Sequence, residues 1–182
     1  MRAAVALTLV LAACAQQPRQ MNTATAFTVL QTPLEFDIRW APSAAWRGES
    51  ATQQFLFYDL ISGHQARPGQ VRVQYVYPKE GQAAPLASLT GAAAAAQEIA
   101  RVYSTPVAAA APVTEVRNAH GTAYLQLGPQ GTLWCGWAVQ NFDEARGIRV
   151  TSCRSGQALG DQTQVREDLR EVLAGMRVRP TA

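Results

Sequence analysis

The sequence contains few of the residues that most often carry chemistry. Its 182 residues include two histidines and three cysteines. His64 and His120 belong to no His-Glu-x-x-His or Cys/His pattern, and no Gly-x-Ser-x-Gly motif or phosphate-binding glycine loop occurs. We therefore expect no metal and no cofactor. Isolated histidines beside glycine turns are also expected to lie on the surface.

Charge and hydrophobicity narrow the class of protein further. The net charge is only +3, and no basic stripe with interleaved aromatic residues occurs, so we expect no nucleic-acid partner. Apolar residues make up 48% and charged residues 16%, which is typical of a globular protein. The alanine run at 92–96 is too short to cross a bilayer, and no other apolar stretch outside the N-terminus is long enough to do so.

The N-terminus has the three parts of an export signal. Arg2 supplies positive charge, residues 3–11 form an apolar segment, and Ala12 and Ala13 are small. With Cys14 following directly, Leu11-Ala12-Ala13-Cys14 resembles the lipobox of bacterial lipoproteins. The alternative is an ordinary secretory signal in which Cys14 is present by chance.

The lipobox resemblance implies an address and an anchor. Residues 1–13 would be removed as a signal peptide, and Cys14 would carry the lipid, whose acyl chains hold such proteins at a membrane. Family members that carry aspartate after the cysteine stay at the inner membrane. Ala15 therefore implies the outer membrane, facing the periplasm. Residues 14–26 lack apolar periodicity and are expected to form the lipidated N-terminus and a tether.

Residues 27–182 are expected to form a single globular domain, and strand signals dominate their first part. Residues 34–40 alternate between apolar and charged side chains, the pattern of a half-buried strand. Residues 41–50 contain Pro42 and Gly48 and are expected to form a loop. Further strands are expected at residues 52–60, 70–77, 113–127 (as two short strands), 132–140 and 148–154, with a short edge strand at 176–180.

Two segments have helical periodicity. The first begins at Pro85 and ends at residues 104–106, with Gln97, Glu98 and Arg101 expected to face solvent. Its apolar positions are Leu86, Leu89, Ala93, Ala96, Ala100 and Tyr103. The second begins with Asp161 as N-cap and Gln164 as its capping-box partner. Its apolar stripe is Val165, Leu169, Val172, Leu173 and Met176, and its polar face is Glu167, Asp168, Arg170 and Glu171.

This order of elements predicts an α+β fold, with a single antiparallel sheet and about two helices packed on it. The order is similar to that of the PsbP/Mog1-like fold. The resemblance rests on residues 27–40 with Pro33, on the segment from Gly121 to Tyr124, and on a last helix that runs into a short strand at 169–178. It implies a scaffold used mostly for binding or assembly rather than catalysis.

Removing Cys14 from the thiol count leaves two cysteines. Cys135 and Cys153 lie in the two arms of a predicted hairpin, each nine residues from Glu144, so they would face each other. In an oxidising compartment such a pair is expected to form a disulfide. The alternatives are two buried free thiols or a catalytic pair. The segment from Trp134 to Ala138 starts like the thioredoxin motif but has alanine in place of the second cysteine.

The lipobox resemblance and the lack of a catalytic motif lead to the expected function. We expect a lipid-anchored periplasmic binding or accessory protein that assists an envelope assembly without catalysis. Its partners would be the membrane, through the anchor, and an envelope protein, for which Trp46, Trp134 and Trp137 are candidate surface residues. The alternative is a cysteine enzyme. His120-Gly121-Thr122 and Ser152-Cys153-Arg154 resemble the catalytic region of L,D-transpeptidases, although the glycine before the cysteine is missing.

Overall fold

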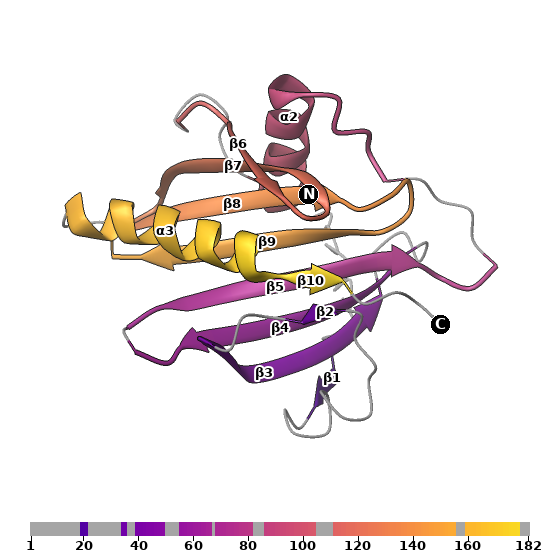
Figure 1. Ribbon diagram of the computed structural model, residues 1–182, viewed down its shortest axis with the longest axis horizontal. Coiled ribbons are helices and arrows are strands. Elements are labelled where there is room, and N and C mark those ends of the chain that lie inside the picture. Colours follow the sequence, from indigo (N-terminus) through magenta and orange to yellow (C-terminus); the bar gives the residue numbers. More distant parts are fainter. Residues whose placement is uncertain are drawn as a thin grey trace, which may run out of the picture.

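A computed structural model describes residues 19–21, 34–35, 39–49, 55–66, 68–81, 86–104, 111–155 and 159–178. One eight-stranded antiparallel sheet runs in the order β1-β3-β4-β5-β9-β8-β7-β6, with helices α2 and α3 packed on it (Figure 1). Strands β10 and β2 form a separate two-stranded ribbon. The predicted α+β class, an antiparallel sheet with two helices, is confirmed. Both strands of this ribbon fall within residues predicted as strand, but their pairing was not predicted.

Most strands lie close to their predicted positions. The strands are β1 (Arg19–Met21), β2 (Leu34–Glu35), β3 (Trp40–Glu49), β4 (Phe55–His64), β5 (Gln70–Pro78), β6 (Thr114–Asn118), β7 (Gly121–Gln130), β8 (Leu133–Asn141), β9 (Gly147–Arg154) and β10 (Arg177–Val178). The predicted bounds of β5, β8 and β9 are correct to within one residue at each end. Strand β4 continues four residues beyond its predicted end.

The prediction for residues 34–50 was wrong in two respects. The expected strand at 34–40 is divided, because Leu34 and Glu35 pair with β10 while Trp40 begins β3. Residues 41–49 form most of β3 rather than a loop. The pairing of β3 with β4 shifts register between Pro42 and Ala44. Such an irregularity accommodates a proline that cannot donate a ladder hydrogen bond.

The expected tether overlaps the sheet. Arg19–Met21 form β1, which pairs with residues 45–47 of β3 at one edge of the sheet. This pairing could not be predicted, because these three residues have no apolar alternation. Cys14 and the rest of the expected signal and tether lie outside the described residues.

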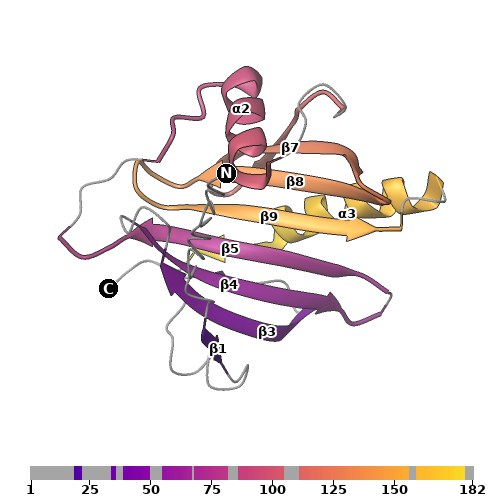
Figure 2. The same ribbon diagram turned by 180° about the vertical axis from the view of Figure 1, so that it is seen from behind.

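The two helices lie on opposite faces of the sheet. Helix α3 (Leu159–Gly175) crosses the face seen in Figure 1, and α2 (Ala92–Tyr103) packs against the other face, seen in Figure 2. Beneath α3 is the larger apolar cluster, which includes Leu60, Val73, Val150 and Leu169. Beneath α2 is a smaller cluster of Ala95, Ile99, Tyr124, Cys135, Trp137 and Val139. Within the described part of the chain, no helix covers β3, β4 and β5 on the α2 face (Figure 2).

Helix α2 presents a different face to the sheet from the one predicted. It begins at Ala92 rather than at Pro85, and its buried residues are Ala95, Glu98 and Ile99. Glu98 was expected to face solvent but is only 3% exposed. The alanine run makes several helical faces equally apolar, so the pattern could not identify the buried one.

Helix α3 follows its predicted apolar stripe, since Val165, Leu169, Val172, Leu173 and Met176 are all buried. Two details differ. Asp161 lies inside the first turn rather than at the N-cap, because the helix begins at Leu159. Asp168 was assigned to the polar face but is 0% exposed, and it accepts hydrogen bonds from Arg154 and Gln164.

Candidate functional site

The disulfide lies at the centre of the sheet on the α2 face. Cys135 in β8 and Cys153 in β9 are direct cross-strand partners, and their sulfurs are bonded at 2.04 Å. Cys135 is fully buried among Ile99, Trp137 and the other residues beneath α2. The predicted disulfide and its register are confirmed. Cys153 therefore has no free thiol in this structure.

The two residues of the alternative enzyme are not brought together. Cys153 packs on the α2 face. The Nε2 atom of His120 instead accepts a hydrogen bond from the backbone N–H of Val178 in β10, 3.1 Å away, on the α3 side. The ring of His120 also contacts Phe142 edge to face. These contacts assign His120 a structural role at the end of α3.

His64 is also structural, which corrects its predicted surface position. Its side chain is 6% exposed and packs edge to face on Trp40, with ring centroids 5.1 Å apart. Nδ1 accepts a hydrogen bond from the N–H of Ala66, and Nε2 lies 3.6 Å from Glu171 Oε2. The imidazole therefore links the end of β4 to α3.

The predicted surface tryptophans have different surroundings. Trp137 is 1% exposed and belongs to the core beneath α2, so it does not form a partner surface. Trp134 is partly buried and packs on the core beneath α3. Trp46 lies in β3 opposite Asp59, and its side chain is outside what the structure describes.

A buried ion pair joins α2 to the sheet. The Nη2 atom of Arg149 lies 3.0 Å from Glu98 Oε1, and these side chains are 4% and 2% exposed. Arg101 also donates from Nε and Nη2 to the same carboxylate, at 2.7 and 2.8 Å. Burial favours the neutral form of Glu98, but the hydrogen bonds from Arg101 and the charge of Arg149 outweigh it and lower its pKa.

A second pair lies on the same face of the sheet. Asp59 in β4 is 1% exposed, and Arg72 in β5 donates to it from Nε at 2.8 Å and from Nη2. The hydrogen bond to Asp59 is the main cause that raises the pKa of Arg72. Arg72 remains 58% exposed, so this carboxylate is covered while its guanidinium reaches the surface.

Arg72 and Arg149 line one cleft of about 340 Å³ between α2 and the sheet. We call it the arginine cleft, and its lining residues are Arg72, Gln74, Val102, Tyr103, Gln130, Trp137, Arg149 and Thr151. Burial raises the pKa of Tyr103 to about 12, although a hydrogen bond with Thr151 and the charges of Arg149 and Arg72 oppose this shift. The Tyr103 hydroxyl donates to the carbonyl of Val150, 3.2 Å away.

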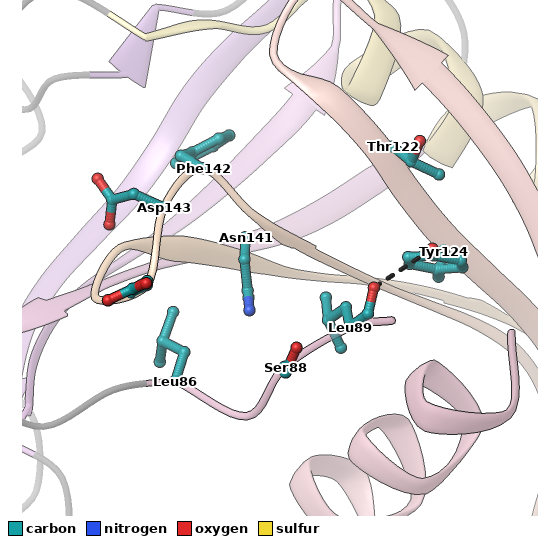
Figure 3. Close-up of a pocket in the computed structure, with 9 residues that line it drawn as sticks. Leu86, Ser88, Leu89, Thr122, Tyr124, Asn141, Phe142 and Asp143 are labelled. Carbon is teal, nitrogen blue, oxygen red and sulfur yellow. Dashed lines mark hydrogen bonds between the residues drawn. The ribbon is translucent and has the colours of Figure 1, made fainter. Parts of the chain in front are cut away.

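A larger hollow of about 740 Å³ lies at the other end of α2 (Figure 3). The loop at 86–90 forms one side and the β8–β9 hairpin the other, with the Asn141 amide directed between them. Asn141 Nδ2 donates to the carbonyl of Ala87 at 2.9 Å, Leu86 N–H donates to Glu144 O, and Tyr124 O–H donates to Leu89 O. These bonds hold the loop to the hairpin, so the polar groups of the hollow serve mainly as structural ties.

Sequence reasoning missed the arginine cleft. Arg149 stands between Ile148 and Val150, where the first four residues of β9 are all buried, and a charged residue at such a position was a signal that something must pair with it. Its partner could not be found, because the buried face of the alanine-rich helix was assigned incorrectly.

Comparisons with protein-family models, with curated proteins and with solved structures gave no match. Among the described residues, no group of histidine, cysteine and carboxylate side chains could hold a metal ion. The helices in the described part of the chain are also too short or too polar to span a bilayer.

Proposed function

We propose that this chain is a lipid-anchored binding or accessory protein of the bacterial envelope, held at the outer membrane and facing the periplasm. The observation that carries the proposal is the Cys135–Cys153 disulfide. Disulfides persist in exported proteins and are rare in the reducing cytosol. The bond supports export, and export is what the signal and lipobox at residues 1–14 would direct.

Binding is favoured over catalysis by the chemistry of the described residues. The thiol required by the alternative cysteine enzyme is engaged in the disulfide, and His120 is bonded to the backbone of β10. The lining of the arginine cleft includes hydrogen-bond donors and the aromatic side chains of Tyr103 and Trp137, which suit recognition. The position of one helix on each face of the sheet also supports the finer proposal of a PsbP/Mog1-like scaffold.

The anchor is tested by labelling cells with radioactive palmitate and separating membranes from soluble protein. We expect the wild-type chain to carry label and to sediment with outer membranes, and the Cys14→Ser variant to lose both properties. The double variant Cys135→Ser, Cys153→Ser is the matched control, because it removes cysteines without touching the lipobox and should keep its label. Label retained by Cys14→Ser would refute the anchor.

The accessory role is tested by crosslinking in living cells. A photoreactive amino acid at Leu133, which is 44% exposed, should capture a defined envelope protein, whereas the same probe at buried Val73 should capture none. Equal yields at the two positions, or no adduct at Leu133 or other exposed sites, would contradict a partner-binding role.

A further inference from the structure

The arginine cleft has more donor groups than its own carboxylates use. Arg149 has five N–H groups. Two from Nη1 go to Asn141 Oδ1 and Ile148 O, and one from Nη2 goes to Glu98. The remaining two, on Nε and Nη2, have no acceptor among the described residues. Since this guanidinium lines the cleft, its spare donors are placed where a ligand could accept from them.

Arg72 repeats this arrangement at the rim. Its Nε and Nη2 atoms donate to Asp59, which leaves both N–H groups of Nη1 without an acceptor within the described part of the chain. The cleft therefore has one guanidinium at its base, 4% exposed, and one at its mouth, 58% exposed. A ligand that reaches the base would pass within range of both.

The local charge favours an anion. Three guanidiniums, of Arg72, Arg101 and Arg149, share two carboxylates, of Asp59 and Glu98. Both carboxylates are almost fully covered, and no acidic side chain is among the described lining residues of the cleft. Carboxylates and phosphates form shorter and stronger hydrogen bonds with arginine than neutral acceptors do.

The other walls limit the size and character of the ligand. Gln74, Gln130 and Thr151 offer neutral hydrogen-bonding groups, while Trp137 and Val102 are apolar. A volume of about 340 Å³ is at the small end of ligand-binding pockets. We propose that the arginine cleft binds a small molecule or chain end through one oxyanion, a carboxylate or a phosphate, received by Arg72 and Arg149.

This inference rests on the proposed binding function and gives it a site and a ligand class. The test uses the purified full-length chain labelled with ¹⁵N, and it follows the arginine Nε–H resonances by NMR. The probes are N-acetylalanine, which carries a carboxylate, inorganic phosphate, and the neutral N-acetylalaninamide. We expect the Nε–H signals of Arg72 and Arg149 to shift saturably with at least one anion and not with the amide. Which anion saturates decides between a carboxylate and a phosphate.

Variants separate this site from general attraction to positive charge. Arg72→Gln should weaken anion binding by about tenfold. Gln74→Glu, which adds negative charge to the same face of β5 and keeps the Arg72–Asp59 pair, should weaken it by a similar factor. Arg146→Gln is the control, because Arg146 is paired with Asp143 on the β8–β9 hairpin and does not line the cleft.

Several results would overturn the site. These are the absence of saturation with either anion, equal shifts at Arg146, and unchanged affinity in both Arg72→Gln and Gln74→Glu. Any of them would leave the anchor standing, because the NMR experiment does not depend on lipid. Loss of the palmitate result would likewise leave the cleft unaffected.

Discussion

Among single residues, removing a buried charged side chain on the α2 face should lower the free energy of unfolding most. The side chains of Glu98 and Arg149 are both almost fully buried. Among the described residues, each is the other's only buried partner of opposite charge. Breaking a buried pair leaves one uncompensated charge in a poorly solvated place. Breaking an ion pair at the surface lowers stability little, because water and salt already screen its charges.

Replacing Glu98 by glutamine should therefore lower the free energy of unfolding by about 3 kcal/mol, since Arg149 then stays buried without a counter-charge. Arg101→Gln is the matched control. Arg101 contacts the same carboxylate but is 70% exposed, so its loss should cost less than about 1 kcal/mol. Urea denaturation of the two variants gives the comparison. Equal losses would show that the depth of the pair is not what matters.

The raised pKa of Tyr103 predicts a loss of stability at alkaline pH. Burial raises its pKa to about 12, from an ordinary value of 10.0. The unfolded chain would thus lose this proton first, and stability present below pH 10 would decline as the pH rises toward about 12. The full effect is about 2 to 3 kcal/mol for a shift of this size. Denaturation of wild type and Tyr103→Phe at pH 8 and about 11 tests this linkage. An equal decline in both proteins would assign it to other groups.

At the level of elements, the packing of α3 on β8 depends on one glycine. A Cβ atom at Gly136 would lie 2.8 Å from both Leu127 Cδ2 and Val165 Cγ1, and it would also contact Leu169 Cδ1. Such distances are too short for carbon atoms, so these three packed side chains would have to shift. The absence of a side chain at position 136 is what allows α3 to approach the strand closely.

Gly136→Ala should destabilise the protein by about 1 to 3 kcal/mol, the usual cost of overpacking a core. Gly160→Ala is the control, because a Cβ there meets nothing within 4 Å. In the first turn of α3, alanine should instead be neutral or stabilise by up to about 1 kcal/mol. Thermal unfolding of both variants measures the contrast. If Gly136→Ala is tolerated as well as Gly160→Ala, the close contact is not limiting.

Elements were predictable where one physical signal dominated. The stripe of α3, the alternation of β5 and the hairpin that pairs Cys135 with Cys153 were each visible in the sequence. Strand β3 was missed because Pro42 and Gly48 resemble loop residues, and only pairing with β4 compensates for them. The arginine cleft was missed for a related reason. Glu98 and Arg149 are 51 residues apart, and only the folded sheet brings them together.

At the scale of the whole molecule, the sheet connects the expected anchor to the candidate site. Strand β1 begins at Arg19, five residues after Cys14, at one edge of the sheet. A chain of five residues spans at most about 18 Å. If Cys14 is lipidated, the edge formed by β1 and β3 would lie close to the bilayer, and β6, at the opposite edge, would lie farther from it.

The disulfide should stabilise the whole fold, because it crosslinks β8 and β9, two central strands of the sheet on which the helices pack. Replacing Cys135 and Cys153 together by alanine should lower the free energy of unfolding by about 3 kcal/mol, the value expected when a bond closes a loop of this length. The sequence separation is 18 residues. Urea denaturation with and without a thiol reductant checks this expectation. Reductant should weaken the wild type by a similar amount and leave the double variant unchanged, since Cys14 lies outside this pair. If the double variant is as stable as the oxidised wild type, the disulfide does not stabilise the sheet.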